Sequence, residues 1–256
     1  MRKTTIVAIL FAVAGLVFAS NDVWKTKPYQ QWDSNDVREV LTNSPWVKKT
    51  SVMASWARGG LGTPQGGQRA QNQNQASQRA GGMNGTSGGA GGMDTRTADQ
   101  SSQVPPEAEA TFFVRWSSAQ TIREAVARNA LLNSQFSQSQ VEQYVNQQPA
   151  AYALLVYGKD MTPFTGESED TLKSAVYLEV KPSKEKISPS EVKITKDSAG
   201  DRIISVEFLF PRQGANGQPL IAASDKQAQF SCKLKMAHID TQFDLRKMSG
   251  KSGEDL

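Results

Sequence analysis

The amino-acid sequence predicts an α+β fold with a largely antiparallel β-sheet, about three helices and one long Gly/Gln-rich loop. Three observations lead to this prediction. Helical patterns occur early in the chain, and short alternating runs separated by turns fill its second half. Residues 57–106 hold more than half of the 20 glycines and almost no large apolar side chains, so we expect this loop to be disordered.

Residues 1–19 have the features of a secretory signal peptide. Arg2 and Lys3 precede an apolar run over 6–18, and small residues end at Ala19, where we place the cleavage. The run is short for a membrane span and polar residues 20–22 follow it, which favours a cleaved signal peptide. The alternative is an uncleaved N-terminal anchor. We therefore expect a periplasmic or secreted protein that meets a membrane only through an uncleaved signal peptide.

Charge and cysteine content narrow the classes of function. Loss of Arg2 and Lys3 lowers the formal net charge from +4 to +2, which is too weak for a nucleic-acid-binding protein. The lysine-rich segment 181–196 has interleaved acids and no aromatic residues, so we interpret it as an exposed hairpin edge. Cys232 is the only cysteine, so no intramolecular disulfide forms and the hydrophobic core must hold the fold.

Residues 20–56 are predicted to supply a helix and the first strand of the main domain. Asp33 is a good N-cap for a helix over 34–42, with Asp36 placed at the third helical position. Trp32 and Val37 have the spacing of a hydrophobic staple, and Pro45 prevents continuation of the helix. These local signals lie close together in sequence and agree with one another.

Two alternating segments flank the loop. Residues 47–56 place Val52 and Trp56 on one face, and residues 110–116 place Phe112 and Trp116 on one face. We expect the two segments to be neighbouring strands of one sheet, because residues 20–56 are too few for a stable domain without disulfides. The intervening loop costs little to close, since the penalty grows with the logarithm of its length.

Four tryptophans in or near the N-terminal segment form a candidate binding surface: Trp24, Trp32, Trp46 and Trp56. The alternative is that they are packing anchors for a short helix, which is the commoner role of tryptophan beside a marked helix start.

The main α+β domain is predicted to span 107–248, followed by a flexible tail over 249–256. Ser117 or Ser118 is expected to cap a helix ending near 132, and a capping box at Ser139 and Glu142 is expected to open the next one. In the first of these helices, Asn129 is placed on the apolar face and Arg123 on the opposite face. Strands are expected at 151–157, 172–181, 191–195, 202–211, 228–236 and 239–247, with the side chains at 204, 206, 208 and 210 facing the core.

Several short motifs together resemble a group of secreted bacterial proteins of unknown function. The opening motif is Trp32-x-x-x-Asp36-Val37-x-x-Val40-Leu41-x-x-Ser44-Pro45-Trp46, and the similarity extends to residues 114–119, 208–211 and 243–248. Proteins with a similar opening are also grouped under a Gly-Trp-x-Thr-Asp label, a string that this chain lacks. The group has no established activity, so the resemblance implies no catalytic residues.

No reactive constellation stands out, and we predict no cofactor, no metal site and no catalytic residues. His238 is the only histidine and is expected to be solvated, while Cys232 is expected to be a buried packing residue. Residues 167–170 form an acidic loop or a helix start. Paired-carboxylate chemistry could use Glu191, Asp201 or Glu207, although nothing in their spacing singles them out.

These observations favour an exported, non-catalytic binding or scaffolding protein of the cell envelope. It would act through a sheet edge or its tryptophan-rich segment, with an envelope protein or a glycan as partner. The alternative is a hydrolase that uses carboxylates only, for example a glycan-active one. In a third hypothesis, the long loop is itself the functional part, as a spacer or tether.

Overall fold

The computed structural model describes residues 22–54, 56, 109–250 and 253–256. The signal peptide and the loop over 57–106 lie outside the described residues. The helices are α1 (Val23–Thr26), α2 (Ser34–Asn43), α3 (Gln120–Leu132), α4 (Gln138–Asn146) and α5 (Glu169–Ala175), and the short 3-10 turns are η1 (Tyr29–Gln31), η3 (Thr162–Phe164) and η4 (Leu245–Lys247). The strands are β1 (Val47–Met53), β2 (Glu109–Trp116), β3 (Ala151–Gly158), β4 (Val176–Lys181), β5 (Glu185–Ile187), β6 (Glu191–Lys196), β7 (Ile203–Pro211), β8 (Gln227–Lys233), β9 (His238–Asp244), β10 (Ser249–Gly250) and β11 (Gly253–Glu254).

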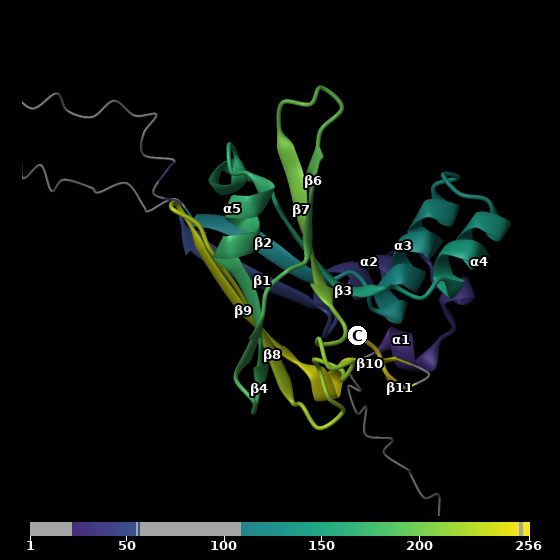
Figure 1. Ribbon diagram of the computed structural model, residues 1–256. Helices are drawn as coiled ribbons and strands as arrows, with labels where there is room; N and C mark the ends of the chain where they lie inside the picture. Colours follow the sequence, from purple (N-terminus) through teal and green to yellow (C-terminus); the bar gives the residue numbers. More distant parts are fainter. Residues whose placement is uncertain (1–21, 55, 57–108, 251–252) are drawn as a thin grey trace, which may run out of the picture.

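Two antiparallel sheets pack against each other, which confirms the predicted fold class. One sheet has the strand order β1-β2-β3-β7-β6 and the other β5-β4-β8-β9. Aromatic side chains join them through the core: the rings of Phe208 and Phe230 are 5.7 Å apart, and those of Trp116 and Phe243 are 5.3 Å apart. The helices α1 to α4 gather at one end of the sheets (Figure 1), whereas α5 lies beside β6.

The pairing of β1 with β2 was the central structural prediction, and it is confirmed. The two strands run antiparallel from Val47 opposite Arg115 to Met53 opposite Glu109. The N-terminal helix and strand therefore belong to the same core as the rest of the described chain.

Helix α2 begins as predicted. The Asp33 carboxylate accepts hydrogen bonds from the backbone N–H groups of Asn35 and Asp36, and the Asp36 carboxylate accepts one from the N–H of Asp33. Backbone hydrogen bonds to its carboxylate, chiefly that of Asp36, hold the pKa of Asp33 below its ordinary value.

The predicted caps of the next two helices were wrong. Helix α3 begins at Gln120, and neither Ser117 nor Ser118 caps it. Helix α4 is capped by Ser137 with Gln140, two residues before the predicted capping box, because the same pattern of Ser and Gln recurs there. On α3, Arg123 is buried and Asn129 is exposed, the reverse of the prediction, because α4 covers the side that carries Arg123.

Strand boundaries in the second half needed three corrections. Residues 172–175 belong to helix α5, so the strand predicted to start at 172 begins at Val176. Ser168 caps this helix, which confirms the interpretation of 167–170 as a helix start. Strand β8 ends at Lys233, and strand β9 at Asp244, before the turn η4. The register of β6 on β7 shifts beside Lys196, and this bulge buries Ile203 and exposes Ile204, contrary to the predicted alternation.

The prediction of a flexible tail over 249–256 was also wrong for the residues that are described. Residues 249–250 pair with 253–254 as the short hairpin β10–β11, and Asp255 is buried. The Asp255 carboxylate accepts hydrogen bonds from the backbone N–H groups of Gln120 and Thr121, so it caps α3. A group far away in sequence thus does what we assigned to a neighbouring serine.

Candidate functional site: a polar groove beside the helices

The tryptophans predicted as a binding surface are mostly internal. Trp24, Trp32 and Trp46 are buried, and the rings of Trp24 and Trp46 meet edge to face at 5.8 Å. The indole N–H of Trp46 donates to the backbone oxygen of Asp255 at 2.8 Å, and that of Trp56 donates to the Asp160 carboxylate at 2.8 Å. Three of the four therefore form no exposed surface, and the packing alternative is confirmed for them.

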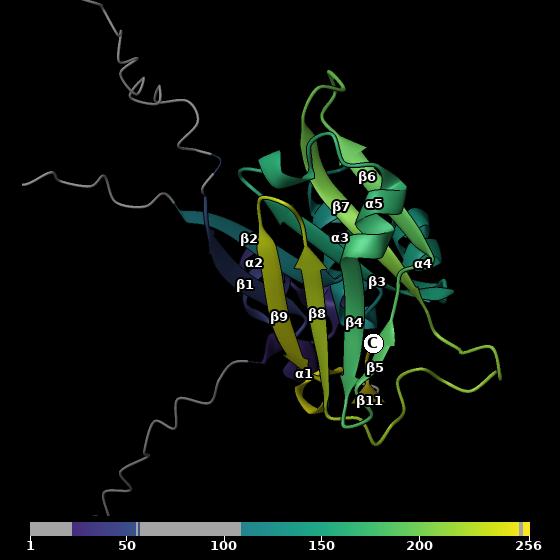
Figure 2. The same cartoon turned by 60° about the vertical axis from the view of Figure 1, so that its left-hand side comes forward.

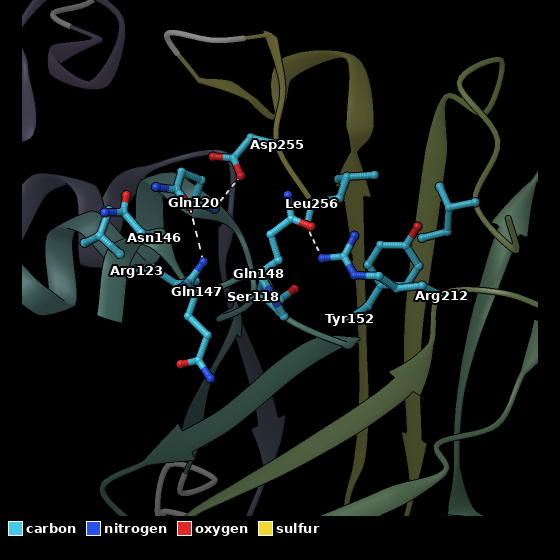
Figure 3. A pocket seen from close by; sticks show the side chains of 13 residues that line it. Ser118, Gln120, Arg123, Asn146, Gln147, Gln148, Tyr152, Arg212, Asp255 and Leu256 are labelled. Atoms are coloured by element: carbon cyan, nitrogen blue, oxygen red, sulfur yellow. Dashed lines mark hydrogen bonds between the residues drawn. The ribbon is translucent and has the colours of Figure 1, made fainter. Parts of the chain in front are cut away.

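Two adjoining cavities form a groove between α4 and the outer face of the five-stranded sheet. We call them the C-terminal cavity, of about 560 Å³, and the sheet cavity, of about 940 Å³. Both are lined by Ser118, Arg123, Gln147, Gln148, Pro149 and Arg212. Figure 3 shows the C-terminal cavity, with side chains from α3, the segment after α4, the end of β7 and the last residues of the chain.

Arg123 is held in place from the helical side of the groove. It lies one turn into α3, and its side chain is only 6% exposed. One guanidinium nitrogen donates to Gln120 Oε1 at 3.2 Å, and the other donates to the backbone oxygen of Tyr144. The guanidinium also lies over the Tyr144 ring, 5.3 Å from its centroid.

Arg212 approaches from the sheet side, directly after β7. Its Nη2 donates to the backbone oxygen of Leu256 at 2.8 Å, and the guanidinium covers the Tyr152 ring at 4.4 Å (Figure 3). Its Nε is buried and has no hydrogen-bond partner among the described residues. This nitrogen remains available as a donor, because an arginine fork can bind two acceptors at once.

Ser118 precedes Arg123 by five residues, just before α3, and lines both cavities. It is 4% exposed, and within the described part of the chain its Oγ has no hydrogen-bond partner. A buried hydroxyl without a partner costs about 1–3 kcal/mol, so such a group calls for an explanation. A bound ligand that pairs with the hydroxyl would supply one.

The outer face of β6 and β7 forms the floor of the sheet cavity and carries charges of both signs. Glu207 accepts a hydrogen bond from Ser117 Oγ at 2.7 Å, and its neighbours on this face include Glu191 and Lys193. Arg115, on β2 nearby, lies over the Tyr157 ring at 5.2 Å. Burial lowers the pKa of Arg115, and the charge of Glu207 acts in the opposite direction.

The acids named for hydrolysis are only partly brought together. Glu191 and Glu207 line the same cavity, whereas Asp201 is exposed in the turn between β6 and β7. Because Lys193 pairs with Glu207 and Glu191 with Leu209, the two glutamates are diagonal neighbours on one sheet face, roughly 7–8 Å apart at Cα.

The lone cysteine and histidine lie outside the groove. Cys232 is fully buried in β8, and burial, with a smaller contribution from Asp240, raises its pKa to about 12. His238 is exposed at the start of β9, with Nε2 2.8 Å from Asp240. Both match the predicted environments.

The described residues contain neither a metal-binding cluster nor a helix that could span a membrane. No group of histidine, cysteine, aspartate or glutamate side chains there could hold a metal ion. No helix there has both the length and the apolar character that crossing a membrane requires.

Comparison with protein-family models, with curated proteins and with solved structures gives no match for this chain. The description of the groove therefore depends on its own residues.

Sequence reasoning missed Ser118, Arg123 and Arg212 as site residues. A signal was present, because two motifs of the resemblance, 114–119 and 208–211, either contain groove residues or end beside them. Without the fold, however, nothing shows that these two motifs meet.

Proposed function

We propose that the chain is an exported, non-catalytic binding protein whose groove holds a ligand that bears a negative charge. The observation that carries the proposal is the meeting of Arg123, Arg212 and Ser118 at the junction of the two cavities. Three separate elements bring these groups together, and two of the three side chains are almost completely buried.

The junction keeps an unused donor, because Arg212 Nε has no hydrogen-bond partner among the described residues. Arg123 donates to two neutral oxygens, Gln120 Oε1 and the backbone oxygen of Tyr144, whereas Arg212 donates to an oxygen of Leu256. Asp255, the acid on the wall of the C-terminal cavity, is engaged by the first N–H groups of α3. Arginine is suited to planar anions such as carboxylates, because its fork donates two parallel hydrogen bonds.

A second candidate function is hydrolysis by carboxylates alone, favoured by the presence of Glu191 and Glu207 in one cavity. Glycosidases place their two acids on either side of the scissile bond. Here both acids stand on the same wall, and Ser117 already donates to Glu207. For this reason binding is the better supported function.

Affinity capture tests the proposal. Immobilised wild type, Arg212→Gln and Arg202→Gln would be incubated with an envelope fraction, and the retained material quantified by mass spectrometry and sugar analysis. Arg202 is the matched control, because its side chain is 75% exposed in the turn between β6 and β7. We expect Arg212→Gln to retain at least about tenfold less than the other two, since one hydrogen bond to a charged group is lost.

Equal retention by all three proteins would contradict the proposal. For the second candidate, wild type and Glu207→Gln would be incubated with polysaccharides of the envelope. Release of reducing ends by wild type alone would establish hydrolysis in place of binding.

A further inference from the structure

We infer that the ligand of the groove is an extended polypeptide segment that presents a carboxylate to Arg123 and Arg212. This inference rests on the proposed function and names the chemical class of its ligand. Three observations support it: how the chain's own last residues lie in the groove, which donors remain unused, and how the aromatic faces are occupied.

The groove already holds a stretch of polypeptide at one end. The Asp255 carboxylate is bound by the backbone N–H of Gln120 and by that of Thr121, the latter at 2.8 Å. The backbone oxygen of Asp255 accepts from the Trp46 indole, and that of Leu256 accepts from Arg212 (Figure 3). A side-chain carboxylate and two successive backbone oxygens are thus each bound by a separate donor, which is how an extended peptide is recognised.

Two buried donors without partners indicate that a second polypeptide segment binds beside residues 255–256. Arg212 Nε and Ser118 Oγ are buried and have no partner within the described residues. Both residues line the sheet cavity, together with the amide side chains of Gln147 and Gln148. A peptide running from this junction over β7 toward Lys193 would present an acceptor at every residue, so one segment could satisfy all of them.

The aromatic faces favour a polypeptide over a neutral glycan. Proteins commonly bind sugar rings by laying them against an open aromatic face. In this groove, Arg123 covers the Tyr144 ring and Arg212 covers the Tyr152 ring. Among the large apolar side chains that the described residues expose, Phe136 is the only aromatic one, and it does not line either cavity.

A displayed library tests this inference without knowledge of the natural sequence. Random 12-residue peptides on phage would be selected on the wild-type protein and counter-selected on Arg212→Gln. We expect the enriched peptides to share an aspartate or glutamate at a fixed position. Synthetic copies should bind wild type and Arg202→Gln alike and should bind Arg212→Gln at least tenfold more weakly. Changing the shared acid to its amide should cause a similar loss.

Circular dichroism and thermal melting of each variant would show that it is folded. Enriched peptides without a shared acid, or peptides that bind Arg212→Gln as tightly as wild type, would overturn the inference. If an acidic oligosaccharide such as oligogalacturonate bound wild type but not Arg212→Gln and no peptide did, the polypeptide inference would be wrong while the proposed function stood. If binding of the peptides, binding of the oligosaccharide and capture from the envelope fraction were all unchanged in Arg212→Gln, the polypeptide inference and the proposed function would both be wrong.

Discussion

Two buried serines differ only in where they lie. Ser118 and Ser231 each have a buried hydroxyl without a hydrogen-bond partner among the described residues. Ser118 lines the groove, whereas Ser231 lies in the middle of β8, away from it. Removing either hydroxyl should therefore change the free energy of unfolding in the same way. Only removal of the Ser118 hydroxyl should also change ligand binding.

Ser118→Ala is expected to leave the free energy of unfolding unchanged or to raise it by up to about 1 kcal/mol, because it removes an unsatisfied buried group. Ser231→Ala should behave in the same way. Only Ser118→Ala should weaken binding of material captured by the wild-type groove, by severalfold. Urea unfolding and a binding titration of both variants check this. A loss of more than about 1 kcal/mol in Ser118→Ala would show that the hydroxyl has a stabilising partner in the free protein.

The thiol of Cys232 is expected to be inert while the protein is folded. Burial, and to a lesser extent Asp240, raises its pKa from 9.0 to about 12. At pH 8 a disulfide reagent such as Ellman's should react only after denaturant is added. Because the unfolded thiol loses its proton above pH 9 and the folded one does not, the stabilising contribution is present below pH 9 and is lost as pH rises toward 12. Cys232→Ala should lack this part of the alkaline pH dependence, and rapid native labelling would contradict the account.

At the scale of elements, α3 depends on a cap supplied from the far end of the chain. Gln120 and Asp255 are 135 positions apart, yet the carboxylate takes the place of a local N-cap. Residues 253–256 should therefore stabilise both the helix and one wall of the groove.

Asp255→Ala is expected to lower the free energy of unfolding by about 0.5–2 kcal/mol, the usual cost of losing an N-cap. Asp255→Asn should lose less, since its amide oxygen can still accept one hydrogen bond. Asp201→Ala is the matched control, because Asp201 is exposed in the turn between β6 and β7. Thermal melts would compare the three, and an equal effect of the changes at 255 and 201 would contradict the role assigned to Asp255.

The two helix starts show what the sequence can and cannot predict. The capping box of α2 lies within four residues, Asp33 to Asp36, so the local pattern was enough. The cap of α3 and the burial of Ile203 depend on a distant carboxylate and on a bulge between strands, and no local window contains either. The groove follows the same rule, because Ser118, Arg123 and Arg212 meet only once β2, α3 and β7 are in place.

At the scale of the whole molecule, the chain leaves β1 and returns at β2 as an adjacent antiparallel pair (Figure 2). Met53 lies opposite Glu109, so the two ends of the intervening segment are close together. Strand β2 contributes directly to the core, because its inward side chains, such as Phe112 and Trp116, are fully buried.

Replacing residues 58–106 with eight Gly and Ser residues is therefore expected to keep the fold. Shortening the closed loop should raise the free energy of unfolding by about 1–2 kcal/mol, according to the logarithmic dependence on length. Circular dichroism would show whether the fold is kept, and urea unfolding would measure the free energy of unfolding. A shortened chain that fails to fold would show that the segment contributes more than connection. A chain that folds but captures nothing from the envelope fraction would favour the hypothesis that the loop is the functional part.

Photo-crosslinking from within the groove tests most directly whether this groove is the ligand site. Benzoylphenylalanine would replace either Gln148, which is exposed beside Arg123 and Arg212, or Lys235, which is exposed in the turn between β8 and β9 at the other end of the sheets. After illumination with the envelope fraction, we predict that the protein labelled at position 148 forms an adduct and the protein labelled at position 235 forms none. The adduct from position 148 should disappear when the same chain also carries Arg212→Gln. An adduct of equal yield from both positions, or one from position 148 that survives Arg212→Gln, would contradict the account.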